Sequence, residues 1–207
     1  MKISITNPHL IPIAVREFKK GSIIVFPTDT SYGLGTIGLK SNDKNIRRIY
    51  DIKSRSFENP LSLLITKKMI TKYVVLDPLT ERILSKYWPG GFTAVFKCKG
   101  QDSQTLSPYL NVNNPQKIAF RVPNHTLLLH IIEEVGSPII GTSANKSGSK
   151  PKYDLHSIIQ EFSEEAIHLW IDAGKLSEIP PSTVVDLTDS SKPILLREGS
   201  VAFETIL

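Results

Sequence analysis

Charged, hydroxyl and amide side chains gather in four short segments of this sequence, and they are the kinds of group that bind phosphate and carboxylate oxygens. Lys53 and Arg55 offer an ammonium and a planar guanidinium two positions apart. Ser143 and Asn145 offer a hydroxyl and an amide with the same spacing. Such groups suit an anionic ligand whose charge they neutralise and whose position they fix. The four segments are Pro27–Gly35, Lys53–Arg55 with Asn59–Leu61, Gly141–Gly148, and Ser182–Asp186 with Leu196–Gly199.

Short apolar runs and amphipathic stretches flank these segments and predict a mixed α/β fold. Because the strands and helices do not alternate strictly, we expect a twisted mixed β-sheet with flanking helices in one domain over residues 1–207. Sheets of this class place ligand sites at strand ends, where the four segments lie. The predicted strands are Ser22–Phe26, Leu61–Ile65, Thr93–Lys97, Lys117–Arg121, Pro138–Ile140, Ile167–Asp172, Thr183–Leu187 and Ile194–Arg197, and the predicted helices are Asp43–Ile52, Leu79–Tyr87, Thr126–Val135 and Leu155–Phe162.

The composition limits the classes of protein that need to be considered. Hydrophobic residues make up 40% of the 207 positions and the net charge is +5, which fits a globular protein with anionic partners such as nucleotides, phosphates or RNA. The single cysteine, Cys98, excludes an internal disulfide and a cysteine-based zinc cluster. The sequence shows no signal peptide and no long apolar run, so we expect a cytoplasmic protein without a membrane partner.

Two glycine-rich segments have the spacing of nucleotide-binding loops but lack the required context. Gly33–Gly38 reads G-x-G-x-x-G, yet residues 36–39 look extended where a dinucleotide site needs a helix, so close backbone packing explains these glycines better. Gly136–Ser143 resembles a phosphate-binding loop, but Thr142 stands where the lysine belongs. The histidines show no paired spacing, so we predict no metal site.

Taken together, six ordered motifs resemble those of the YrdC-like threonylcarbamoyl-AMP synthases, from about residue 10 to residue 200. The resemblance implies a twisted mixed sheet around a deep basic groove, in the short, single-domain form of the family. A Trp88-Pro89-Gly90 turn adds to it. The motifs are P-T-D-T-S-Y-G-L-G at Pro27–Gly35, K-x-R at Lys53–Arg55, R-V-P at Arg121–Pro123, S-A-N-x-S-G at Ser143–Gly148, S-T-V-V-D at Ser182–Asp186 and L-R-x-G at Leu196–Gly199.

The resemblance also implies a reaction and a role for each motif residue. L-threonine, bicarbonate and ATP would give threonylcarbamoyl-AMP and pyrophosphate, and a tRNA threonylcarbamoyl transferase complex would use the product on adenosine 37 of tRNA. ATP would arrive with Mg²⁺, and no tightly bound cofactor is expected. Lys53 and Arg55 would be catalytic. The ATP contacts would be Lys53, Arg55, Asn59, Ser143, Asn145 and Arg197, and the threonine contacts Thr30, Arg121 and Ser182, with Arg121 suited to a bidentate carboxylate pair.

Two departures from the family pattern concern details of the site. Some relatives have a threonine-contacting histidine in the strand after K-x-R, whereas Leu61–Ile65 has none, and Gly91 replaces a proline. A sister branch of less certain activity lacks intact K-x-R and S-A-N motifs, which this chain keeps.

Other functions stay open. The main alternative is a module that binds double-stranded RNA or tRNA without catalysis, and another is a different ATP-using enzyme. Binding through phosphate contacts alone would weaken steeply with salt. Pyrophosphate release that needs both threonine and bicarbonate would identify the synthase.

Overall fold

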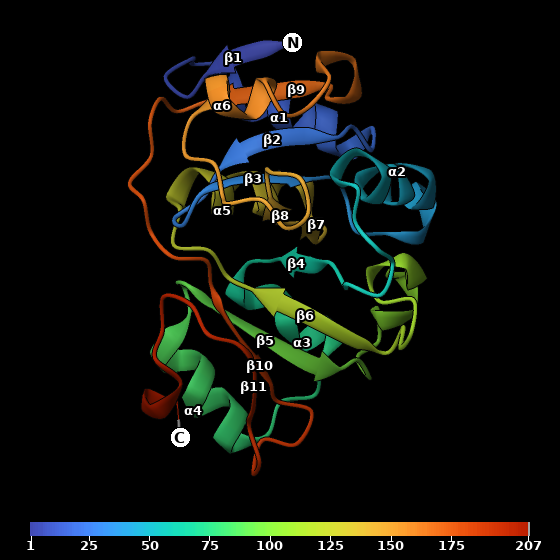
Figure 1. The fold of residues 1–207 in the computed structure, drawn as a ribbon. Helices are drawn as coiled ribbons and strands as arrows, with labels where there is room; N and C mark the ends of the chain where they lie inside the picture. The colour runs from blue at the N-terminus through green and yellow to red at the C-terminus, as the bar shows by residue number, and fades with distance from the viewer. Residues whose placement is uncertain (207) are drawn as a thin grey trace.

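The structure, a computed structural model, describes residues 1–206, whose strands form two mixed sheets (Figure 1). In order, the first sheet is β1 (Lys2–Ser4), β9 (Leu169–Asp172), β2 (Ile24–Pro27), β3 (Tyr32–Gly35) and β8 (Thr142–Ser143). The second sheet is β11 (Ile194–Arg197), β10 (Thr183–Asp186), β5 (Phe92–Lys97), β6 (Lys117–Arg121), β4 (Ser62–Leu64) and β7 (Ile139–Ile140). Both sheets contain parallel and antiparallel pairs, which confirms the mixed α/β class.

The sequence predicts one sheet, and the two observed sheets meet in one segment, residues 139–143. Its first half, β7, pairs with β4 of the second sheet, and its second half, β8, pairs with β3 of the first. Ile139 also forms a bridge with Ile37 in the same register as the β3–β8 pairs. The backbones approach closely here, since a Cβ at Gly35 would lie 1.7 Å from the Ile140 carbonyl oxygen.

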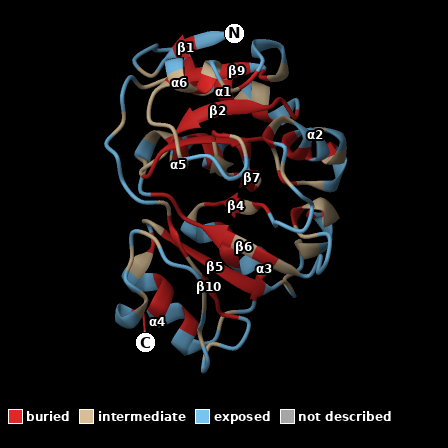
Figure 2. Ribbon diagram, in the orientation of Figure 1, coloured by how far each residue is buried: buried red, intermediate tan, exposed pale blue. Residues whose placement is uncertain are grey.

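Six α-helices among residues 1–206 cover the sheets, and their apolar faces follow the predicted periodicity. In α2, Ile46, Ile49 and Tyr50 are buried on one face. A left-handed Gly136, with φ of 74°, ends α5. Figure 2 shows buried residues along the strands of both sheets. The helices are α1 (Leu10–Lys19), α2 (Asp43–Lys53), α3 (Ile70–Tyr73), α4 (Pro78–Tyr87), α5 (Thr126–Val135) and α6 (Leu155–Ile159), with 3₁₀ turns at Lys40–Asn42, Lys67–Met69, Ser103–Thr105, Pro108–Leu110, Glu164–Ala166 and Phe203–Thr205.

Several elements differ from the sequence-based prediction. Helix α1 was not predicted. It contains Pro12, which lies in the first turn of the helix, where proline costs no hydrogen bond. Strands β1 and β3 were also missed, and α6 ends at Ile159 rather than Phe162. The glycines of the G-x-G-x-x-G spacing lie in and just after β3, not at a helix start. No helix among the described residues is long and apolar enough to cross a bilayer.

Candidate functional site

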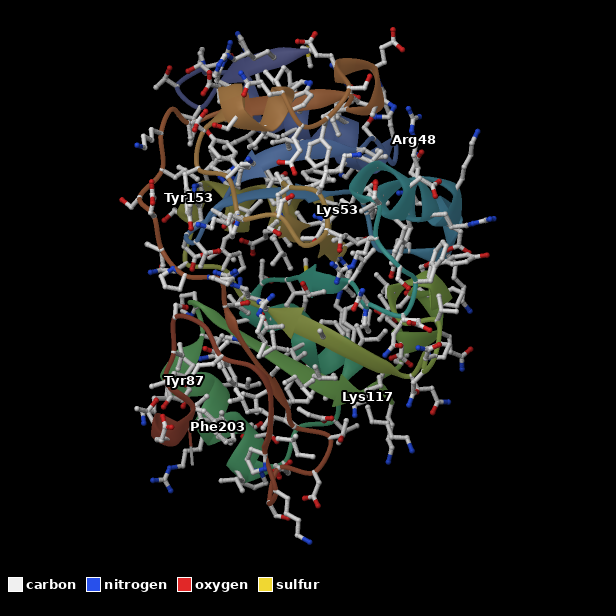
Figure 3. The ribbon with its side chains drawn as sticks, viewed as in Figure 1. Arg48, Lys53, Tyr87, Lys117, Tyr153 and Phe203 are labelled. Carbon is white, nitrogen blue, oxygen red and sulfur yellow. The ribbon has the colours of Figure 1, made fainter. Side chains whose placement is uncertain are left out.

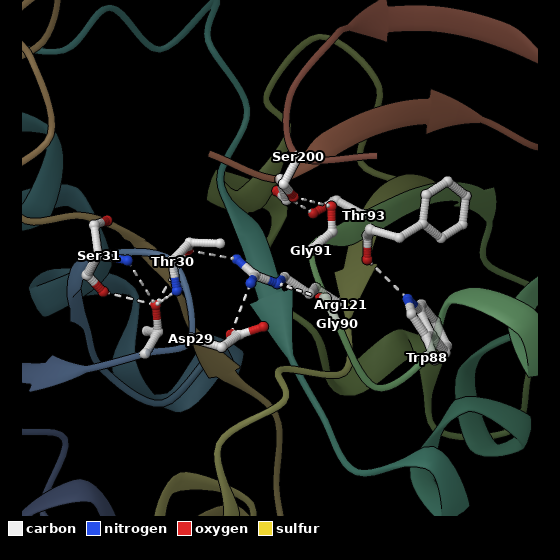
Figure 4. A network of polar contacts seen from close by, with 12 residues as sticks. Asp29, Thr30, Ser31, Trp88, Gly90, Gly91, Thr93, Arg121 and Ser200 are labelled. Atoms are coloured by element: carbon white, nitrogen blue, oxygen red, sulfur yellow. Dashed lines mark hydrogen bonds and ion pairs between the residues drawn. The ribbon is translucent and has the colours of Figure 1, made fainter. Parts of the chain in front are cut away.

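Arg121, the last residue of β6, is buried among polar partners from other segments. All three of its guanidinium nitrogens donate: Nε to the Gly90 carbonyl at 2.9 Å, Nη1 to Thr30 Oγ1 at 3.1 Å and Nη2 to Asp29 Oδ1 at 2.7 Å (Figure 4). The Arg121 and Asp29 side chains are 9% and 14% exposed. Burial lowers the pKa of Arg121 and the Asp29 carboxylate opposes this shift. Arg121, which the family resemblance assigns to the carboxylate of threonine, thus already has a carboxylate partner within the protein.

Strand pairing brings Ser182 toward Arg121 through Thr93. Thr93 pairs with Arg121 across β5 and β6, and with Val184 across β5 and β10. Its hydroxyl lies 2.7 Å from the Ser182 hydroxyl. Arg197 of β11 donates from Nη2 to the Ser182 carbonyl at 2.7 Å and to its hydroxyl at 3.2 Å. Thr93 is therefore a site residue that the sequence analysis missed, because a lone threonine inside an apolar strand gives no signal.

Arg197 lies within range of the charges of two arginines from other motifs, Arg121 and Arg55. Burial is the main cause of the lowered pKa of Arg197, and the charges of Arg121 and Arg55 lower it further. Arg55 donates to the carbonyl oxygens of Asn59 and Pro60, both at 2.9 Å. Among residues 1–206, Arg55 and Arg197 have no carboxylate within 4.0 Å, whereas Arg121 has Asp29. This excess of positive charge favours an anionic ligand.

Lys53 ends α2 and continues its buried face, so its side chain enters the protein rather than solvent (Figure 3). It is 1% exposed. Its ammonium donates to the carbonyl oxygens of Ser143 at 2.5 Å and Asn145 at 2.6 Å, while the Ser147 N–H donates to the Lys53 carbonyl at 2.8 Å. Burial lowers the pKa of Lys53 to about 7, with a smaller contribution from Arg55 in the same direction. Lys53 thus ties the end of α2 to the segment 143–147.

The stretch Lys53–Arg55 is not extended. Ser54 adopts a left-handed conformation with φ of 49° and caps α2. As a result, Lys53 contacts the segment after β8, whereas Arg55 contacts residues 59 and 60. The two cations of the K-x-R motif therefore bind different parts of the backbone instead of lying side by side.

In the segment 143–149, some polar side-chain groups form hydrogen bonds within the loop and others have no partner. The Asn145 side chain, 4% exposed, donates to the carbonyl oxygens of Lys146 at 2.8 Å and Ser149 at 2.7 Å. Its Oδ1 is buried without a partner among residues 1–206. Ser143 is half-buried, and its hydroxyl has no hydrogen-bond partner in the described part of the chain. Ser143 can therefore meet a ligand directly, while the Asn145 amino group shapes the loop.

The structure thus arranges the predicted residues in three connected groups. Thr30, Arg121, Ser182 and Arg197 form one, Lys53, Ser143 and Asn145 another, and Arg55 with the exposed Asn59 the third. Two neighbours were not predicted besides Thr93. Asp29 lies within the first motif but had no assigned role, and the half-buried His125 caps α5 by accepting from the Leu128 N–H at 3.3 Å. Asp29 raises the pKa of His125, although burial lowers it more.

The two described cavities lie away from the motif residues, and the described residues contain no metal-binding cluster. One described cavity of about 590 Å³ lies along α1 and another of about 270 Å³ lies between α3 and α4, and neither is lined by a motif residue. Residues 1–206 contain no cluster of three or more histidine, cysteine or acidic side chains able to hold a metal. The basic groove and the Mg²⁺ stay predictions.

Comparisons with known proteins agree with the motifs. A family profile for Sua5, YciO and YrdC, described as "Telomere recombination", matches residues 16–199. The threonylcarbamoyl-AMP synthase of Pyrococcus abyssi is 32% identical over 200 residues, which are 95% of this chain but only 56% of that protein. The chain thus spans about half the length of this relative.

Two solved structures have the same fold. P. abyssi Sua5 complexed with L-threonine has a TM-score of 0.85 at 30% identity, covering 100% of this chain and 59% of that one. Escherichia coli YciO has a TM-score of 0.85 at 27% identity, covering 100% of this chain and 98% of that one. Because the profile matches most of the chain and the motifs agree with it, this protein belongs to the Sua5/YciO/YrdC family.

Proposed function

We propose that this chain is an L-threonylcarbamoyladenylate synthase, a nucleotidyltransferase that converts L-threonine, bicarbonate and ATP into threonylcarbamoyl-AMP and pyrophosphate. The observation that carries the proposal is the group of hydroxyls and guanidiniums formed by Thr30, Arg121, Ser182 and Arg197, with Arg55 near enough for its charge to act on Arg197. Of the three arginines, only Arg121 has a carboxylate partner among residues 1–206, and the half-buried Ser143 offers a further hydroxyl. Such an arrangement suits one compact ligand with a carboxylate at one end and phosphates at the other.

The amino-acid end is formed by Thr30, Arg121 and Ser182. Arg121 is fixed on three sides by hydrogen bonds, so it presents its remaining N–H groups to a carboxylate without a large loss of side-chain freedom. The Thr30 and Ser182 hydroxyls lie beside the guanidiniums of Arg121 and Arg197, respectively. A similar protein from P. abyssi was solved with L-threonine, which supports this assignment.

The nucleotide end is formed by Arg55, Asn59, Ser143 and Arg197, with Lys53 and Asn145 beneath them. Arg55 and Arg197 are held by carbonyl oxygens, which fix their position but do not neutralise their charge. Their charge would offset that of the triphosphate, and Ser143 would donate to a phosphate oxygen. ATP would bring Mg²⁺ as part of the substrate.

The reaction has two steps, and the protein acts in both by holding groups in place. The threonine amine attacks bicarbonate, a carbon–nitrogen bond forms and water leaves, giving a carbamate. A carbamate oxygen then attacks the α-phosphate of ATP, and pyrophosphate leaves with the electrons of the broken phosphorus–oxygen bond. Bicarbonate, the carbamate, the triphosphate and the leaving pyrophosphate are all anionic, which explains the need for several arginines. The product would pass to a tRNA threonylcarbamoyl transferase complex in the cytoplasm.

The test is pyrophosphate release, measured with each substrate omitted in turn. The proposal expects release only when ATP, L-threonine and bicarbonate are all present, together with threonylcarbamoyl-AMP detected by mass spectrometry. Release without threonine would indicate a different ATP-using enzyme. No release, combined with tRNA binding that weakens steeply as salt increases, would indicate the RNA-binding alternative.

A further inference from the structure

Asp29 occupies a turn that is held rigidly next to the proposed amino-acid site. The Thr28 hydroxyl donates to the Ser31 carbonyl at 2.6 Å and accepts from the Thr30 and Ser31 N–H groups at 3.1 and 3.2 Å. The turn between β2 and β3 is therefore fixed on both sides of Asp29. As a result, the Asp29 carboxylate, 14% exposed, is fixed in position rather than moving freely on the surface.

Only one oxygen of this carboxylate has a protein partner. Oδ1 accepts from Arg121 Nη2 at 2.7 Å, whereas no residue among 1–206 donates to Oδ2. Figure 4 shows the second oxygen outside the dashed contact to Arg121. An ionised carboxylate can accept several hydrogen bonds, so Asp29 retains unused capacity at a partly buried site, where a charged contact is strong. The turn thus places an anionic acceptor beside a buried guanidinium.

We propose that Asp29 binds the α-amino group of the amino-acid substrate and selects ligands that carry a free amine; this inference rests on the proposed function. The α-carboxylate and α-amine of an amino acid are neighbouring groups of opposite charge. Arg121 and Asp29 are likewise neighbouring groups of opposite charge. Arg121 binds the carboxylate and Asp29 Oδ2 accepts from the amine, so each charge of the ligand meets its opposite. The amine is thereby held in one place for its reaction with bicarbonate.

The alternative is that Asp29 only holds Arg121 in position, and the choice of ligand separates the two roles. L-threonine and 3-hydroxybutanoate share the carboxylate and the hydroxyl, but only threonine has the amine. Binding of both is measured by calorimetric titration, without turnover, for the wild type, Asp29→Asn and Asp29→Glu. Asp189→Asn, at an exposed aspartate far along the sequence, is the matched control.

The proposal expects the wild type and Asp189→Asn to prefer threonine over 3-hydroxybutanoate by about 10- to 150-fold, the range of one charged hydrogen bond. Asp29→Asn loses this preference because threonine binding weakens while 3-hydroxybutanoate binding changes little. Asp29→Glu keeps the negative charge and therefore retains part of the preference for threonine. The affinity for ATP, titrated in the same way, stays unchanged in all variants.

Other outcomes overturn the inference. If Asp29→Asn weakens both ligands equally, the residue only positions Arg121. If Asp29→Asn does not fold, the same preference is read from Asp29→Ala, and an unchanged wild-type preference there overturns the inference. If the wild type releases pyrophosphate as proposed but shows no preference between the two ligands, the inference fails while the proposed function stands. If the wild type neither binds threonine nor releases pyrophosphate, the inference and the proposed function both fail.

Discussion

Arg121 and Lys53 are both cations buried in the protein, but their surroundings differ. Arg121 has a carboxylate partner and hydroxyl neighbours, whereas Lys53 has two backbone carbonyls and no carboxylate within 4.0 Å among residues 1–206. Arg121 is placed by the register of a β-ladder, and Lys53 by the periodicity of a helix face. A buried cation with a counterion and free N–H groups can bind a ligand. A buried cation whose N–H groups donate to backbone carbonyls acts mainly by fixing the loop that carries those carbonyls.

The largest expected effect is that of Arg121→Ala. Removing the guanidinium leaves the Asp29 carboxylate partly buried without its partner, and breaking a buried pair in this way costs about 3–5 kcal/mol in the free energy of unfolding. Threonine binding, measured by titration, should fall much more than ATP binding. An equal loss of both affinities would assign Arg121 to general charge in the region rather than to the carboxylate.

A double variant separates the two consequences of that change. Arg121→Ala combined with Asp29→Ala removes both charges, so we expect much of the lost stability to return while threonine binding stays absent. Urea unfolding and titration on the same samples give both quantities. Recovery of threonine binding in the double variant would contradict the assignment, and the exposed Arg48→Ala serves as the control for loss of a cation.

Lys53→Met tests whether the buried Lys53 acts by holding the segment 143–147. The methionine fills a similar volume but removes one donor from the Ser143 and Asn145 carbonyls. The Ser143 carbonyl still accepts from the Asn145 N–H at 2.9 Å, so mainly the Asn145 carbonyl loses its partner, which should cost about 1–3 kcal/mol of stability. Amide hydrogen exchange should accelerate at residues 143–147. Lys44→Met, on the exposed face of the same helix, should change neither. Unchanged exchange in that segment would show that Lys53 does not hold the loop.

Arg55→Ala and Ser143→Ala should mainly affect the nucleotide. Each removes one charged hydrogen bond of about 1.5–3 kcal/mol, which corresponds to roughly a 10- to 150-fold loss of ATP affinity or turnover, while the fold survives. If these side chains were only solvated surface groups, their removal would cost tenths of a kcal/mol. The comparison is with Lys19→Ala, an exposed lysine of α1. Variants that bind ATP as tightly as Lys19→Ala would remove Arg55 and Ser143 from the site.

The sequence predicted much of the fold because hydrophobic periodicity determines which faces are buried. The predicted helix Asp43–Ile52 and strand Lys117–Arg121 correspond closely to α2 and β6. Thr30, Arg121, Ser182 and Arg197 lie in one group of polar contacts near strand ends, whereas Lys53 and Arg55 contact different segments. The sequence could not show that residues 139–143 would pair with both sheets, because that depends on the close approach of Gly35 to the Ile140 carbonyl.

Side-chain partners were the least predictable part of the site. A K-x-R spacing shows that two cations lie near each other in the sequence, but the left-handed Ser54 determines that they turn toward different partners. Asp29 has no special signal beyond its place between two threonines, and only the β2–β3 turn brings it to Arg121. Such contacts depend on the tertiary structure, which a local pattern does not specify.

A further expected effect is a change of stability with pH that depends on Lys53. Its folded-state pKa is about 7, below the ordinary value of 10.5, because burial disfavours the charged form. Between these two values the unfolded chain binds more protons at this residue than the folded chain does. The free energy of unfolding should therefore rise as pH increases from about 7 toward 10, by at most about 1.4 kcal/mol per pH unit. Urea unfolding of the wild type and of Lys53→Met at several pH values isolates this contribution, since other groups titrate equally in both.

The difference in stability between the two proteins should grow with pH. A difference that stays constant would mean that the carbonyls of Ser143 and Asn145 stabilise the charged ammonium enough to offset its burial, so that Lys53, like Arg121, keeps its positive charge throughout.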